Sequence, residues 1–129
     1  MPNRGDNFTV KLKNAHLGWG THRHTNSRKR RNGEAYLKIP ASVAYSLNIT
    51  NRNLNGQSQL YNFSTSDGFI TKKILKASGN QYKKQFAKQF HGFRNLKLLG
   101  SWFRQINAKV GDEIKVEFLS SNEIILSKL

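Results

Sequence analysis

Alternation of apolar and polar residues marks several short strands along the chain. Every second residue of Phe8–Lys13 is apolar, which predicts a β-strand with one buried face. The same pattern predicts strands at Ala35–Ile39, where Pro40 ends the strand, and at Leu60–Thr65. These strands are short and are separated by polar, turn-rich segments. The pattern therefore favours a mainly β fold.

Two pairs of strands are expected to form hairpins. A turn at Ser66–Gly68 should lead into Phe69–Thr71 as the partner of the preceding strand. Near the C-terminus, Glu113–Phe118 alternates, and a Ser-Ser-Asn turn returns through Glu123–Leu126. This closing antiparallel hairpin is the strongest structural signal in the chain.

Helical spacing occurs in two places. Ala41–Leu47 follows Pro40, which suits the first turn of a helix. Phe93–Ile106 carries an apolar stripe with helical period. The residues of this stripe are Leu96, Leu99, Phe103 and Ile106. About seven short strands with one or two short helices predict a mainly β (α+β) fold that closes into a small barrel, because closure removes exposed strand edges.

Length and composition limit the class of protein. The 129 residues suit one domain, which we expect to cover residues 1–129. The chain has no cysteine, which excludes disulfides, thiolate nucleophiles and cysteine-based zinc sites. The polar N-terminus lacks the apolar core of a signal peptide, and no apolar run approaches the ~20 residues of a spanning helix. We therefore expect a cytoplasmic protein with no membrane partner.

The distribution of charge changes this picture. The net charge is +15, and the 44 residues between Asp67 and Asp112 contain ten Lys or Arg but no acidic residue. A second basic cluster lies in the polar segment Gly18–Gly33, which has no apolar periodicity and should form a long loop or hairpin. A field of this strength favours a polyanionic partner, and nucleic acids are the most obvious candidates.

Two segments combine cations with side chains that contact bases. Arg and Lys pair with guanine edges, and Asn and Gln pair with adenine. In the first segment the candidate DNA-binding residues are Trp19, His22, Arg23, His24, Asn26, Arg28, Lys29, Arg30, Arg31 and Asn32. In the second they are Asn80, Gln81, Lys83, Lys84, Gln85, Lys88, Gln89, His91, Arg94 and Asn95.

The aromatic residues of the two segments have two possible roles. Tyr82, Phe86, Phe90 and Phe93 could stack on bases, as aromatic side chains do in single-strand binders. Anchoring the segment to the core is the favoured interpretation for most of them. Trp19 is similarly interpreted as a packing anchor at the root of the first segment rather than as a base contact.

Catalytic and metal chemistry have weaker support. The residues His16, His22 and His24 could serve zinc, but the neighbouring arginines repel a cation and no carboxylate joins them. Glu113 and Lys115 match half of a metal-dependent nuclease site, for which Asp67 or Asp112 could be the partner. Any acidic strand with a nearby lysine matches that pattern. We expect no metal, no cofactor and no catalytic residue.

An ordered series of short motifs resembles a known family. The motifs are Leu17–Gly20, Gly33–Pro40, Thr65–Gly68, Ser78–Asn80 and Leu98–Arg104. Together they resemble the C-terminal recognition domain of the NgoFVII-type (phospholipase-D-like) restriction endonucleases. The resemblance covers most of the chain, although each motif alone is unspecific.

The resemblance implies a fold and a function. The fold is the B3-like, seven-stranded open pseudobarrel of plant B3 transcription factors, which grips the DNA major groove with an N-arm and a C-arm. The arms correspond to Trp19–Gly33 and Gly79–Asn95, and a helix is implied at Leu96–Arg104. Relatives carry a nuclease domain ahead of this module, and its His-x-Lys motif is absent here.

The hypothesis that follows is a binding module and not an enzyme. We expect sequence-specific binding of double-stranded DNA by a domain that is monomeric and serves recognition in a restriction-modification or related defence system. A nuclease domain or subunit is a candidate partner.

Three alternatives remain open at this stage. A small basic RNA-binding protein, such as a ribosome-associated one, would have the same high pI. A swapped-hairpin transcription factor of the AbrB type is suggested by Ile39-Pro40 and by the segment 110–113. A compact magnesium-dependent nuclease is the third.

Overall fold

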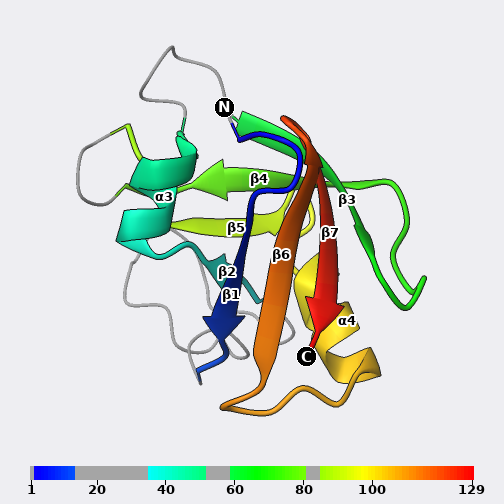
Figure 1. Ribbon diagram of the computed structural model, residues 1–129. Helices are drawn as coiled ribbons and strands as arrows, with labels where there is room; N and C mark the ends of the chain where they lie inside the picture. Colours follow the sequence, from blue (N-terminus) through cyan, green and yellow to red (C-terminus); the bar gives the residue numbers. More distant parts are fainter. Residues whose placement is uncertain (1, 14–34, 52–58, 81–84) are drawn as a thin grey trace.

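Seven strands pair into one sheet that curls into a nearly closed barrel (Figure 1). The computed structural model describes residues 2–13, 35–51, 59–80 and 85–129. The strands are β1 (Asn7–Lys11), β2 (Leu37–Lys38), β3 (Gln59–Thr65), β4 (Lys73–Ser78), β5 (Gln89–Gly92), β6 (Glu113–Ser120) and β7 (Glu123–Lys128). Their order in the sheet is β1-β6-β7-β3-β4-β5-β2, and only β3 and β7 run parallel. The predicted seven-stranded β pseudobarrel is confirmed.

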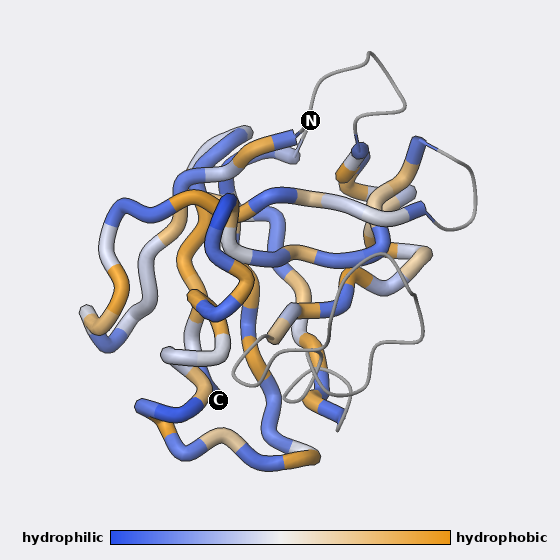
Figure 2. Tube along the Cα trace, turned by 180° about the vertical axis from the view of Figure 1, so that it is seen from behind, coloured by the Kyte–Doolittle hydropathy of each residue, from blue (hydrophilic) through white to orange (hydrophobic). Residues whose placement is uncertain are grey.

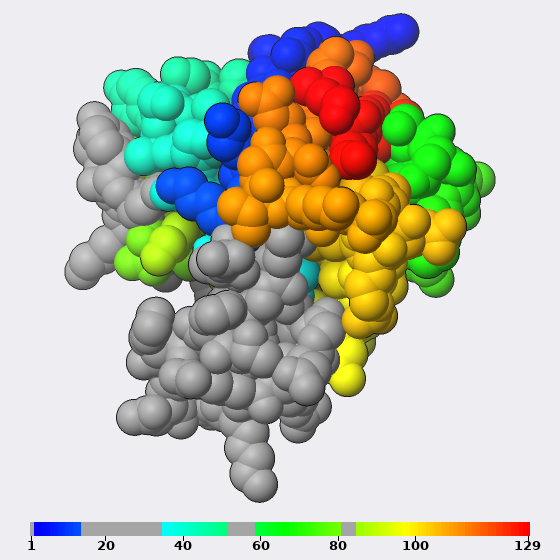
Figure 3. Space-filling view, turned by 90° about the horizontal axis from the view of Figure 1, so that it is seen from below, coloured from blue at the N-terminus to red at the C-terminus, as the bar shows by residue number. Residues whose placement is uncertain are grey.

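Two short helices lie on opposite flanks of the barrel (Figures 1 and 3). Helix α3 (Ala41–Leu47) has the predicted bounds. It begins after Pro40 and ends at Asn48, which adopts a left-handed conformation with φ 57°. Helix α4 (Leu98–Gln105) lies between β5 and β6 along the chain. Neither helix is long and apolar enough to cross a membrane, and the described residues contain no other helix.

Helix α4 is shorter than its sequence pattern predicted. The expected helix began at Phe93, whereas residues 93–97 form turns. Arg94 has φ 59°, which is incompatible with a right-handed helix. The side-chain Oδ1 of Asn95 then accepts a hydrogen bond from the backbone N–H of Lys97 at 3.1 Å, just before the helix begins. The apolar stripe itself is confirmed, because Leu99 and Phe103 are buried.

The turn between β3 and β4 is wider than predicted. Phe69–Thr71 does not continue as the hairpin partner, and the paired strand begins at Lys73. Two side chains explain this difference. Asp67 Oδ1 accepts from the backbone N–H of Phe69 at 2.9 Å, and Thr65 Oγ1 accepts from that of Ile70 at 3.0 Å. These bonds satisfy donors that a strand ladder would otherwise pair.

Large aromatic side chains fill the barrel. Apolar and polar positions alternate along the strands (Figure 2), and the apolar ones point into one continuous core. Tyr61 on β3 is 1% exposed and makes edge-to-face contacts with Phe90 and Phe118, at ring-centroid distances of 5.6 and 5.8 Å. Burial raises the pKa of Tyr61 to about 12, so the phenol stays neutral.

A hydrogen bond ties α4 to the β3–β4 turn. The indole Nε1 of the buried Trp102 donates to Asp67 Oδ2 at 2.9 Å. Thr65 Oγ1 donates to the other carboxylate oxygen of Asp67 at 2.6 Å. The hydrogen bonds from Thr65, from the backbone of Phe69 and from Trp102 lower the pKa of Asp67 below its usual value of 3.8. The turn and the helix thus share one charged acceptor.

This acceptor should make stability depend on pH. Because the pKa of Asp67 is lower in the folded state, its stabilising effect is complete above pH ~4 and is lost as the pH falls through the folded value. Asp67→Asn should reduce stability at neutral pH, since one of the two accepting oxygens becomes an N–H₂ group, which accepts no hydrogen bond, and the negative charge is lost. The difference from the unsubstituted protein should shrink on acidification, as measured by urea unfolding followed by circular dichroism.

The control is Glu113→Gln, which makes the same change in net charge on the exposed end of β6. The side chain of Glu113 does not accept the hydrogen bond from Trp102, which goes to Asp67. A stability difference for Asp67→Asn that stays constant between neutral and acidic pH would contradict the assigned role of this carboxylate.

Candidate nucleic-acid interface

Strand β5 joins the two parts of the barrel that carry the candidate DNA-binding segments. On one side β5 pairs with β4, with His91 opposite Lys76 and Gln89 opposite Ser78. On its other side β5 pairs with β2, with Gln89 opposite Lys38. Direct partners in an antiparallel pair point to the same face of the sheet. Phe90, Leu75 and Leu37 point into the core. The residues that alternate with them along each strand therefore point outward.

The outward surface of β2, β4 and β5 is basic. Its cations are Lys38 and Lys76, and Gln89 and His91 supply neutral polar groups beside them. No Asp or Glu occurs in β2, β3, β4 or β5. We call the outward residues Lys38, Lys76, Gln89 and His91 the β5 face. Cations without neighbouring acids create a positive potential that attracts anions.

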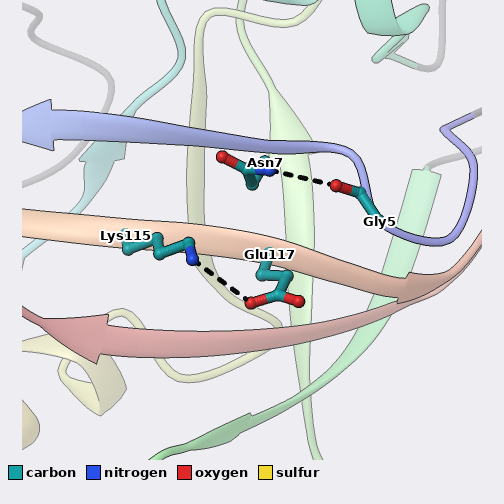
Figure 4. Close-up of polar contacts among 4 residues, drawn as sticks. All are labelled: Gly5, Asn7, Lys115 and Glu117. Atoms are coloured by element: carbon teal, nitrogen blue, oxygen red, sulfur yellow. Dashed lines mark hydrogen bonds and ion pairs between the residues drawn. The ribbon is translucent and has the colours of Figure 1, made fainter.

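The opposite half of the sheet has a balanced charge. The acidic residues in or beside β1, β6 and β7 are Asp6, Asp112, Glu113, Glu117 and Glu123. Lys115 pairs with Glu117 at 3.6 Å on β6, and Glu117 lies opposite Asn7 of β1 (Figure 4). Lys128 pairs with Asp112 at 3.8 Å. These pairs neutralise this half of the sheet. Among the residues that the structure describes, the excess of positive charge therefore lies in the other half.

The predicted N-arm residues lie outside the described part of the chain. All ten of them, from Trp19 to Asn32, fall within residues 14–34. The segments on either side of this range are described. Leu12 follows β1 and donates its backbone N–H to Asp112 O at 2.8 Å. Ala35 precedes β2 and donates its N–H to Leu96 O at 3.1 Å.

The predicted C-arm residues divide into four groups. Gln81, Lys83 and Lys84 lie outside the described residues. Asn80, Gln85 and Lys88 belong to the connection between β4 and β5. Gln89 and His91 lie in β5 itself, while Arg94 and Asn95 follow that strand. The stretch that the sequence treated as one arm therefore contains a paired strand of the barrel, and from here on the C-arm denotes only residues 79–88, which precede that strand.

Two of the aromatic residues in this stretch serve the core. Phe86 is 5% exposed and Phe90 is fully buried, which confirms their interpretation as anchors. Phe93 is only half-buried, and the guanidinium of Arg94 lies 4.9 Å from its ring centroid. Among the described members of the series, Phe93 is thus the one that combines an aromatic ring with access to solvent.

A buried asparagine holds the root of the C-arm. Asn51 is 3% exposed, and its Nδ2 donates to Gly79 O at 2.6 Å and more weakly to Phe86 O at 3.4 Å. Its backbone N–H donates to Gln85 O at 2.9 Å. Gly79 and Phe86 are therefore held by one side chain that follows α3. Sequence reasoning missed Asn51, which looked like part of a polar connection.

Gly79 is required where the C-arm leaves β4. Its φ is +71°, and a Cβ at this position would lie 3.0 Å from the Cβ of Lys88. The Lys88 backbone bridges the two neighbouring strands, donating to Ser78 O at 2.8 Å and accepting from the N–H of Ile39 at 2.9 Å. A side chain at position 79 would therefore push on a residue that the sheet holds in place.

Three of the four candidate nuclease residues have side-chain contacts that serve the fold. Asp67 binds Trp102 and the β3–β4 turn, and Asp112 accepts from the Lys109 N–H at 2.8 Å in addition to its pair with Lys128. Lys115 pairs with Glu117. Across the described ranges, no group of three His, Asp or Glu residues could hold a metal ion. The zinc candidates His16, His22 and His24 lie outside those ranges.

Sequence reasoning also missed Lys38 and Lys76. Both occupy polar positions of alternating strands, where a lysine is normally a solvated residue. The signal available in the sequence was the stretch without acidic residues between Asp67 and Asp112. This stretch contains Lys76, but it does not show which residues lie next to Lys76 in the folded protein. Only the strand register places Lys38 and Lys76 on one surface with Gln89 and His91.

Comparison of the chain with protein-family models, with curated proteins and with solved structures gives no match. The function is therefore inferred from the chain's own residues.

The role of Asn51 can be tested by substitution. Asn51→Ala removes the donor that holds Gly79 O and Phe86 O, and it should lower the free energy of unfolding by about 1–3 kcal/mol. Asn62→Ala is the matched control, because Asn62 is exposed on β3; its effect should stay within about 0.5 kcal/mol. Urea unfolding midpoints measure both. Equal midpoints for the two variants would show that Asn51 does not hold the C-arm root.

Proposed function

We propose that this protein binds double-stranded DNA through the β5 face together with the N-arm and the C-arm. In this proposal it is a B3-like recognition module, reads a short sequence in the major groove, and serves a restriction-modification or related defence system. Catalysis would belong to a separate nuclease domain or subunit. The positions of the two arm roots carry the proposal.

The roots of the arms lie at opposite ends of β5. The C-arm leaves β4 at Gly79 and returns through Lys88, next to the first residue of β5. The N-arm returns through Ala35, whose N–H bonds to Leu96 O just beyond the other end of β5. Four residues of antiparallel strand span about 10–14 Å, which is close to the ~12 Å width of the major groove. Arms rooted at these ends are spaced to enter one groove.

The charge of the β5 face supports a phosphate-bearing partner. Lys38 and Lys76 lie between the two arm roots, where no acidic side chain of β2, β3, β4 or β5 opposes them. Neutralised phosphates release counterions, which drives binding in a way that does not depend on sequence. The basic residues of the arms, above all Arg28–Arg31, would add to this contribution.

Specificity would come from the polar residues that accompany the cations. Gln89 and His91 are half-buried on the β5 face, which limits their rotamers and suits directed hydrogen bonds. The Oδ1 of Asn95 is engaged with the Lys97 N–H, so its Nδ2 is the donor it can offer to a base. In this proposal cations set the register on the backbone, and amides and imidazole read base edges.

The test that separates DNA from RNA is selection from a randomised duplex library at near-physiological salt, with structured RNA as the competitor. We expect enrichment of one short duplex motif despite the RNA, because the amides of the arms read base edges that an A-form major groove hides. Enrichment of no motif, with RNA displacing the duplex, would assign the basic surface to RNA and overturn the proposal.

The β5 face can be tested by the salt dependence of binding. Lys38→Ala combined with Lys76→Ala should flatten the slope of log K against log salt by about 1.8, since each lost phosphate contact contributes about 0.9. The matched control is Lys115→Ala combined with Lys128→Ala, which removes the same charge from the half where acids pair with these lysines. Equal slopes for the two double variants would remove the β5 face from the interface.

A further inference from the structure

A pocket opens at the end of β4 and β5 that lies away from the C-arm. Its volume is about 330 Å³, near the lower end of the range for small-molecule sites. The lining residues are Lys72, Lys73, Ile74, Phe93, Asn95 and Leu98. The β3–β4 turn, the start of β4, the turn after β5 and the start of α4 all contribute to it.

The backbone holds this pocket in a defined shape. Phe93 donates its N–H to Ile74 O at 2.9 Å, which continues the β4–β5 pairing and places these two side chains across from each other. Lys72 has φ 51°, and its N–H donates to Ser64 Oγ at 3.1 Å. Asn95 O accepts from the N–H of Leu98 at 3.2 Å. These bonds hold the backbone of the pocket's lining segments in place.

Gly92 allows the chain to turn around the pocket. A Cβ at this position would lie within 2.7 Å of Leu98 Cβ and would overlap the carbonyl oxygen of Asn95. Only glycine permits this close approach, which brings Phe93 and Asn95 together at one site.

The lining has the chemistry of a nucleotide site. Phe93 and Ile74 offer an aromatic ring and an apolar surface for a base, and Ile74 is 37% exposed. Lys72 and Lys73 are exposed and can bind a phosphate, while Asn95 Nδ2 can donate to a base edge. The lining contains no acidic residue. Both oxygens of Asp67, in the neighbouring turn, are already engaged by Trp102, Thr65 and Phe69.

The pocket is continuous with the β5 face. Lys76 and His91 form one outward row across β4 and β5, and two residues further along these strands lie Ile74 and Phe93. The root of the N-arm is adjacent, since Ala35 bonds to Leu96, between the lining residues Asn95 and Leu98. A duplex bound between the arms would pass this opening.

We propose that this pocket binds a single nucleotide, with its base against Phe93 and Ile74 and its phosphate at Lys72 and Lys73. In the DNA complex this nucleotide is one that has left the base stack. This inference rests on the proposed DNA binding and adds to it an extrahelical base. Leaving the stack costs least where the base is mispaired, so a mismatched duplex should bind more tightly than a paired one.

The probes are two short duplexes of the same sequence that differ at one position. In one, 2-aminopurine is opposite thymine; in the other it is opposite cytosine as a mismatch. We expect tighter binding of the mismatched duplex, and a change of 2-aminopurine fluorescence on binding. Phe93→Leu should weaken binding of the mismatched duplex by roughly 5- to 150-fold, the range for losing one base–aromatic stack, and should leave the paired duplex nearly unaffected.

Two controls separate stacking from folding. Leucine keeps an apolar side chain at position 93, and the melting temperature of the variant shows whether the barrel is intact. Phe69→Leu is the matched control, because Phe69 is 46% exposed in the β3–β4 turn and does not line the pocket. Lys73→Ala should weaken binding of the mismatched duplex more than that of the paired one.

A titration with free deoxyadenosine monophosphate identifies the source of the nucleotide. Mismatch preference that depends on Phe93 supports a nucleotide from the bound strand. Binding of the free nucleotide that depends on Phe93, without mismatch preference, supports the same pocket chemistry with a free ligand. Equal affinity for both duplexes and no binding of the nucleotide would overturn the inference while leaving DNA binding intact. Failure to bind either duplex would instead overturn the proposed function.

Discussion

The pairing of β5 with two neighbours is the constraint on which the rest of the site depends. This four-residue strand hydrogen-bonds to β4 on one side and to β2 on the other. Its inward Phe90 is fully buried against Tyr61, so the strand cannot slip by one residue without exposing an aromatic ring. The fixed register sets the outward row, the roots of both arms and the position of Phe93 at the pocket.

The charge arrangement follows from the same sheet. A net charge of +15 opposes compaction, and acidic residues spread evenly among the cations would lower this cost. Here the acids gather around β1, β6 and β7 and pair with Lys115 and Lys128. The half that contains β4 and β5 keeps its cations unopposed by acids in these strands. An arrangement that sacrifices electrostatic stability on one face is typical of a surface that binds a polyanion.

A few individual residues outside the basic surface fix the turns and the arm root around it. Asn51 fixes the C-arm root, Gly79 and Gly92 permit close approaches of the backbone, and Asp67 links α4 to the β3–β4 turn. None of these residues belongs to the basic surface. The two polar side chains hold turns by hydrogen bonds, and the two glycines leave room for neighbouring backbone and side chains, so the chain leaves the barrel and returns at defined points.

Local pattern determined much of the fold. The closing hairpin of β6 and β7, the bounds of α3 and the number of strands follow from alternation, turn residues and Pro40, because these signals act over a few neighbouring residues. Local pattern failed where side chains replaced the ladder, at Thr65 and Asp67, and where Arg94 adopted a left-handed conformation. It also missed β5, because a strand of four residues with two buried positions is too short to show a clear alternating pattern.

Charge and alternation are properties of neighbouring residues, so the two basic segments and the mainly β core were predictable without a structure. Which residues share a surface depends on how the strands pair in the folded protein. Lys38 and Lys76 are far apart in the chain, and Phe93 meets Ile74 only through the β4–β5 register. The reason is that register depends on which side chains fill the barrel, and this packing involves all seven strands at once.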